Sequence, residues 1–180
     1  MMRRIASFAA AALALSTASA NGVVVGLQDD QASNNPAAGS ILQRADMFAA
    51  TGARWSRLDV DWTLVAPTAP INPADPADPA YMWARYDAIL LAMRARGIGV
   101  MVTVTGTPAW ASSTGRWNAT PAAASGSAFI EALARRYNGS YVRDDGVTLP
   151  SIRSISPRNE PNINLLTTPQ CQKRNGRWVP

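Results

Sequence analysis

The residues best suited to chemistry lie at positions 158–162 (Arg-Asn-Glu-Pro-Asn), directly after a predicted strand at residues 152–156. Parallel β/α folds assemble their active sites at the carboxyl ends of their strands. A carboxyl there, such as that of Glu160, can protonate the oxygen of a glycosidic bond as the bond breaks. The neighbouring amide of Asn159 can hold a sugar hydroxyl. The pair therefore indicates acid-assisted cleavage of a glycoside.

A second candidate group lies on an earlier predicted strand, residues 55–60, where Arg57 carries a rigid fork of donors. A guanidinium of this kind suits a carboxylate and can keep a nucleophilic one ionised. Asp59 and Asp61 alternate along the segment and so share a face. We interpret both as structural partners of nearby arginines rather than as catalytic groups. Glu131, the only other glutamate, lies in a predicted helix and is interpreted as a solvated surface charge.

Two tryptophans follow the ends of predicted strands and could take part in binding. Trp62 comes after the strand at residues 55–60, and Trp110 comes after a strand at residues 98–105. Each offers a flat apolar face on which a pyranose ring can lie, but tryptophan is also a common filler of protein cores. At this point both interpretations stay open.

The elements that must position these residues alternate between strand and helix. In the helix predicted at residues 86–96, apolar side chains recur at the i, i+3, i+4 and i+7 spacing, and Gly97 provides the stop. The predicted strands are residues 23–27, 55–60, 98–105 and 152–156, and the predicted helices are residues 41–50, 86–96 and 122–137. This order favours a parallel sheet in an α/β fold. The proline-rich residues 67–79 are interpreted as a loop rather than as a domain linker.

Three motifs, in this order, resemble glycoside hydrolase clan A, the retaining β/α-barrel glycosidases that include cellulase-like and β-xylosidase-like enzymes. They are residues 55–62, residues 105–110 and Asn159-Glu160-Pro161-Asn162. The resemblance implies a (β/α)8 TIM barrel, of which residues 21–180 are expected to be the amino-terminal half with about four β/α units. It also implies a site with Glu160 as the acid/base, Asn159 and Arg57 as its catalytic helpers, and Trp62, Trp110 and Asn162 as substrate-binding residues.

The resemblance is incomplete in two respects. A retaining mechanism needs a second carboxylate about 5 Å from the first, which the clan places on its seventh strand and which we expect to lie beyond Pro180. We therefore expect the polypeptide as printed to be a truncated barrel that is inactive by itself. Pro157 and Arg158 also stand where the clan often has an aromatic residue, and a proline there removes a ladder donor. The alternatives are a non-catalytic secreted carbohydrate-binding protein, or a half-barrel that self-associates and so covers its sheet edges.

The remaining features concern export and possible partners. Residues 1–20 have the charged start, apolar core and Ala-Ser-Ala end of a signal peptide, which predicts a secreted or periplasmic protein without a membrane span. The net charge is +5, but the basic residues are spread along the chain, so no nucleic-acid partner is expected. The sequence has no histidine and one cysteine, Cys171, which excludes histidine-dependent catalysis and an internal disulfide. No cofactor and no metal ion are expected.

Overall fold

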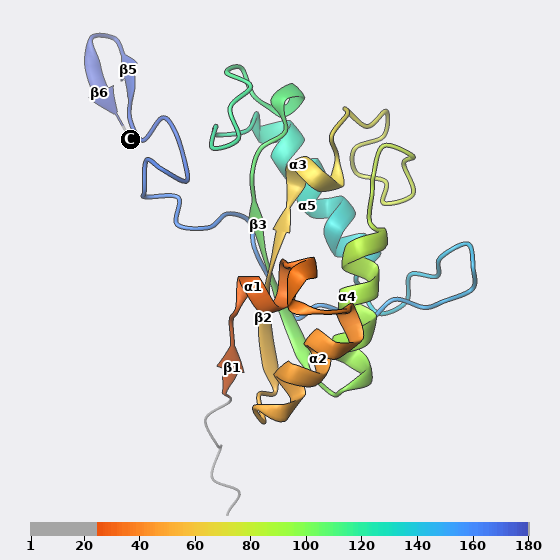
Figure 1. The fold of residues 1–180 in the computed structure, drawn as a ribbon. Coiled ribbons are helices and arrows are strands. Elements are labelled where there is room, and N and C mark those ends of the chain that lie inside the picture. The colour runs from red at the N-terminus through yellow and green to blue at the C-terminus, as the bar shows by residue number, and fades with distance from the viewer. Residues whose placement is uncertain (1–24, 180) are drawn as a thin grey trace, which may run out of the picture.

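A four-stranded parallel sheet is the framework of residues 25–179, the part of the chain that the computed structural model describes (Figure 1). Its strands are β1 (Gly26–Leu27), β2 (Trp55–Asp61), β3 (Gly99–Thr105) and β4 (Ser154–Ser156), in the spatial order β1-β2-β3-β4. The prediction of a parallel sheet in an α/β fold is thereby confirmed. Among the described residues the sheet is open, since β1 pairs only with β2 and β4 only with β3. The predicted signal peptide lies outside the described residues, as do residues 23–24 of the first predicted strand.

The two central strands carry most of the pairing. β2 and β3 match residue for residue over seven positions, from Trp55 opposite Gly99 to Asp61 opposite Thr105. β4 is shorter than the strand predicted at residues 152–156, because the amide of Ile152 donates to the carbonyl of Tyr137 instead of joining the ladder. At its carboxyl end the strand stops before Pro157, which has no N–H to donate.

The helices follow the predicted order, with short additions. The three main ones are α2 (Ile41–Ala50), α4 (Ala84–Ala95) and α5 (Ala123–Arg136), each within two residues of its predicted bounds. α2 begins with a capping box, in which the hydroxyl of Ser40 accepts from the amide of Gln43 and the Gln43 side chain accepts from the amide of Ser40. The additional pieces are α1 (Asp30–Asn34), α3 (Trp62–Val65) and the single 3-10 turns Pro36–Ala38 and Ala109–Ala111.

The chain after β4 ends in an antiparallel hairpin of β5 (Gln172–Arg174) and β6 (Arg177–Val179). Figure 1 shows this hairpin standing away from the parallel sheet. Cys171, just before β5, is exposed and forms no disulfide with another described residue. Residues 67–79 contain no helix or strand. No helix within residues 25–179 has the length and apolarity that crossing a membrane demands.

The main helices all lie on one side of the sheet (Figure 1). Toward them the central strands present buried side chains such as Leu58, Val60 and Val102, and α5 adds Phe129 and Leu133 to the same core. Alternate residues of β2 point to the opposite side and are only half-buried. This alternation gives the sheet one apolar face that the main helices cover and an opposite face that carries polar groups.

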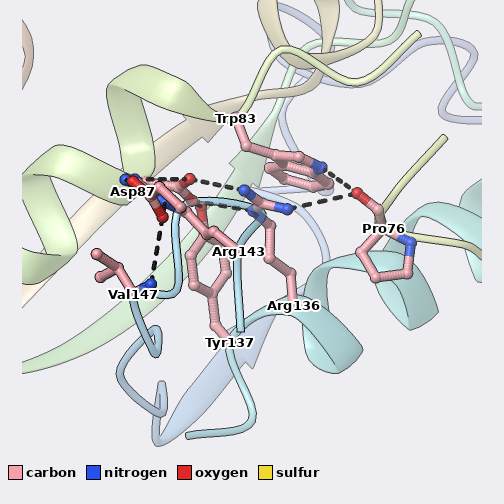
Figure 2. Close-up of polar contacts among 8 residues, drawn as sticks. Pro76, Trp83, Asp87, Arg136, Tyr137, Arg143 and Val147 are labelled. Atoms are coloured by element: carbon pink, nitrogen blue, oxygen red, sulfur yellow. Dashed lines mark hydrogen bonds and ion pairs between the residues drawn. The ribbon is translucent and has the colours of Figure 1, made fainter. Parts of the chain in front are cut away.

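A buried ionic cluster joins α4 to α5 at the edge of this core (Figure 2). The carboxylate of Asp87 on α4 accepts from the Nε (2.9 Å) and Nη2 (2.6 Å) atoms of Arg136 on α5, and from the hydroxyl of Tyr137 (2.8 Å). Arg143 approaches the same carboxylate at 3.5 Å, and the Arg136 guanidinium lies 5.5 Å from the ring of Trp83. Burial raises the pKa of Tyr137 well above its ordinary range, so its hydroxyl keeps the proton that it donates to Asp87.

Candidate active site

The candidate residues of β2 lie on the face of the sheet opposite the main helices. Arg57, Asp59 and Asp61 alternate with residues that point into the core, so their side chains emerge together on the other side. The register places Asp59 beside Thr103 of β3, and Thr103 beside Ser156 of β4. The carboxyl ends of three strands therefore meet at one edge, which is where the sequence predicts the site.

Arg57 and Asn159 are brought together from positions 102 residues apart in the sequence. The Nη2 atom of Arg57 donates to the side-chain oxygen of Asn159 at 2.8 Å, and its Nε and Nη2 atoms both lie 3.4 Å from Oδ1 of Asp59. Burial raises the pKa of Asp59, an effect that the charge of Asp30 reinforces and that of Arg57 opposes. Asp59 is thus a structural partner of an arginine, as expected. With its oxygen held by Arg57, the amide of Asn159 has a fixed direction for its NH2 group.

Glu160 lies beside this pair but outside the regular strand. β4 ends at Ser156, so three residues separate the strand from Glu160. The backbone of Glu160 has a φ of 39°, in the left-handed region that a non-glycine residue rarely adopts. Its side chain is exposed and forms no hydrogen bond or ion pair with another described residue, while its carbonyl accepts from the amide of Ile163 at 3.1 Å. The carboxyl is accordingly open to solvent and to a ligand.

Arg158 fixes the segment that carries Asn159 and Glu160. Its Nη1 donates to Oγ1 of Thr107 at 2.9 Å, and its Nε to Oγ1 of Thr167 at 2.7 Å. Its Nη2 donates to the carbonyls of Ala119 and Leu166, at 2.9 and 3.1 Å. The guanidinium therefore joins the loop after β4 to the loop after β3, and burial lowers its pKa. Sequence reasoning treated this residue only as a departure from the clan pattern.

The residues predicted to bind substrate occupy different environments. Trp62 is 2% exposed and stacks on Phe129 with ring centroids 4.6 Å apart, so in this structure it is part of the core. Trp110 packs edge-on against Trp62 at 5.6 Å, is partly exposed, and donates from Nε1 to the carbonyl of Ala66 at 2.8 Å. Asn162 is exposed in the turn that follows Glu160. Of the two tryptophans, only Trp110 offers appreciable surface.

Sequence reasoning missed a polar pair at the ends of β2 and β3. The carboxylate of Asp61 caps α3 through Oδ1, which accepts from the amide (2.9 Å) and hydroxyl (2.6 Å) of Thr63. Its Oδ2 lies 3.4 Å from Nε1 of Trp117, which is 44% exposed. The expected arginine partner of Asp61 is therefore replaced by Thr63 and Trp117. The Asp-x-Thr spacing at 61–63 was the available signal for the cap, whereas nothing in the sequence pointed to Trp117.

The candidate site thus consists of one exposed carboxyl, one oriented amide and one guanidinium at the carboxyl edge of the sheet. Within residues 25–179, no group of three or more histidine, cysteine, aspartate or glutamate side chains is placed to hold a metal ion. No known family model matches this chain, and no curated protein shows significant similarity to it. The arrangement places an exposed carboxyl beside an amide and a guanidinium, two groups that can bind hydroxyls.

Proposed function

We propose that this chain supplies the acid/base part of a secreted retaining glycoside hydrolase that cleaves O-glycosidic bonds of a poly- or oligosaccharide. In this proposal residues 25–179 are the first four units of a clan A (β/α)8 barrel, and the amino-terminal signal directs export. The observation that carries it is the 2.8 Å hydrogen bond from Arg57 to Asn159, next to Glu160. It joins two of the three motifs that carry the clan resemblance, the one on β2 and the one after β4.

The chemistry assigned to Glu160 is the transfer of one proton. As the bond between the anomeric carbon and the glycosidic oxygen breaks, the electron pair stays with that oxygen, and the carboxyl of Glu160 protonates it. The NH2 group of Asn159 faces away from the guanidinium that holds its oxygen, so it can donate to a ring hydroxyl. Hydrogen bonds of this kind strengthen as the oxocarbenium-like transition state forms.

The second carboxylate of a retaining mechanism is not assigned to a described residue. Glu131 lies on α5, where it forms an exposed ion pair with Arg135. Asp59 is committed to Arg57, at 3.4 Å. In the proposal the nucleophile therefore comes from another part of the protein, as the clan resemblance implies, and an informative assay must not depend on where it lies.

The test supplies the nucleophile from solution. Azide is a small anion that can attack the anomeric carbon of an aryl glycoside: a carbon–nitrogen bond forms, the carbon–oxygen bond breaks, and the phenol leaves with a proton from Glu160. The full chain is incubated with azide and a panel of phenyl and 2,4-dinitrophenyl β-glycosides, and release of the phenol is measured. Glu160→Gln should abolish release from phenyl glycosides and spare dinitrophenyl glycosides, because a good leaving group needs no proton.

Glu131→Gln is the matched control, because it alters the other glutamate at a site that only forms an exposed ion pair. It should release both phenols at the wild-type rate. Equal loss on both substrates in Glu160→Gln would contradict the acid role. Binding of oligosaccharides without release of either phenol, in the presence of azide, would refute the hydrolase proposal and favour a non-catalytic carbohydrate-binding protein.

A further inference from the structure

Trp117 is an exposed tryptophan whose ring is nevertheless fixed in place. The residue is 44% exposed, and its Nε1 lies 3.4 Å from Oδ2 of Asp61. That carboxylate is itself immobilised, because its other oxygen caps α3 through Thr63. The backbone of Trp117 is also held in place, since its carbonyl accepts from the amide of Thr107 at 2.8 Å.

A glycine allows the indole and the carboxylate to meet. Gly106 follows the last residue of β3 and has a φ of +67°, a conformation that favours glycine. A Cβ atom at this position would lie 2.5 Å from Oδ1 of Asp61 and 2.6 Å from Nε1 of Trp117. The indole edge therefore rests directly on the backbone at Gly106. One edge of the ring thus contacts the end of β3, while the residue as a whole remains 44% exposed.

The same loop is joined to the candidate active site. Thr107, which holds the backbone of Trp117, accepts from Arg158 through its hydroxyl at 2.9 Å. Arg158 immediately precedes Asn159 and Glu160. The loop that carries Trp117 is therefore tied to the segment that carries Glu160, although the two segments follow different strands.

We propose that Trp117 is a carbohydrate-binding platform at the carboxyl ends of β2 and β3, on which the apolar C–H face of a pyranose ring stacks. This rests on the proposed function and deepens it by naming a substrate-positioning residue. A tryptophan supplies a large apolar area together with one polar group, the indole N–H. Here the N–H faces Asp61, which leaves the ring face for a ligand. Because the ring is held before binding, little side-chain entropy is lost when a sugar stacks on it.

The chemistry also indicates the class of sugar. A pyranoside whose hydroxyls are all equatorial directs its C–H bonds to the two faces of the ring, so either face can lie flat on an indole. Cellotetraose, a chain of such rings, is therefore the probe. Its dissociation constant is measured by titration calorimetry for the full chain and for Trp117→Ala, Trp117→Phe and Gly106→Ala.

Trp117→Ala should weaken binding at least about tenfold, from the aromatic contact that is lost. Trp117→Phe keeps a ring and should lose less. Gly106→Ala retains the indole but displaces it, so it should approach the effect of Trp117→Ala. Trp178→Ala is the matched control, because Trp178 is 72% exposed on the β5–β6 hairpin, and it should bind as the wild type does. Circular dichroism shows whether each variant is folded. If Gly106→Ala is not folded, the comparison of Trp117→Ala with Trp117→Phe provides the test.

The outcomes separate this inference from the proposed function. Equal affinity for wild type and Trp117→Ala, or no cellotetraose binding by the folded wild type, overturns the platform, whatever Glu160 does. A similar loss in Trp178→Ala also overturns it, because the effect would then not be specific to the sheet edge. Loss of binding in Trp117→Ala together with an unchanged rate in Glu160→Gln supports the platform and refutes the acid role.

Discussion

The buried ionic cluster between α4 and α5 allows a quantitative test of what holds the helices together. We consider Asp87→Asn, which preserves the shape of the side chain and removes its charge. Asp87 is 2% exposed and receives three donors within 2.9 Å, from Arg136 and Tyr137. Removing one member of a buried ion pair typically costs about 3–5 kcal/mol, because the partner charge is left desolvated without compensation.

For a chain of this size, that loss corresponds to a decrease in melting temperature of roughly 6–20 °C. The free energy of unfolding is obtained from urea titrations followed by far-ultraviolet circular dichroism, with the slope against urea checked for constancy. A change confined to the midpoint indicates a loss of stability in the native state. A changed slope would instead indicate a more expanded native or denatured state.

The matched control is Asp46→Asn. Asp46 also forms an ion pair with an arginine, Arg96, at 2.6 Å, the same length as the shortest Asp87–Arg136 contact, but its side chain is 67% exposed. Solvent screens such a pair, so the control should leave the urea midpoint close to that of the wild type. If Asp87→Asn costs no more than Asp46→Asn, burial is not what gives the cluster its importance and the reasoning is refuted.

Two further predictions concern the sheet edge. Arg158→Gln removes the donors that join Thr107 to Thr167, so amide hydrogen exchange of residues 159–168 should become faster. Exchange in β2 and β3 should stay as it is in the wild type. Unchanged exchange in residues 159–168 would contradict the role of Arg158 in holding this loop. Burial raises the pKa of Asp59 in the folded chain, so the folded state binds a proton more readily than the unfolded state does. The free energy of unfolding should therefore fall as pH rises from about 4 through the folded pKa of Asp59, and it should level off above that pKa. Asp59→Asn should abolish that fall, and urea midpoints between pH 3 and pH 8 measure it.

The regular elements were predictable because their signals are local. The apolar spacing along α4 and the glycine that follows it define one helix, and the unbroken β-branched run of β3 defines a buried strand. The β5–β6 hairpin was missed although its signal was present. Asn175 and Gly176 both have positive φ, and Asn-Gly is a strong two-residue hairpin turn.

The arrangement of the candidate site was only partly predictable. Arg57 and Asn159 could be assigned to one sheet edge, since parallel strands place their carboxyl ends together, but their direct hydrogen bond depends on how the chain leaves β4. The bracing by Arg158 involves two loops and a threonine that no local pattern distinguishes. The burial of Trp62 was equally undetermined, because the same residue type serves a core and a sugar platform, and only the packing of Phe129 decides between them.

The unequal lengths of the strand pairs have a consequence for how the chain reaches this structure. Among the described residues, β2 and β3 share seven residue pairs, whereas β1 and β4 contribute only two and three. The proline-rich loop and the whole of α4 lie between β2 and β3 along the chain. Bringing the two strands together therefore costs the conformational entropy of this long connection before their pairing can stabilise the structure. We therefore expect the rate of folding to be set by the meeting of β2 and β3 with α4 packed across them, and the two outer strands to join a sheet that already exists.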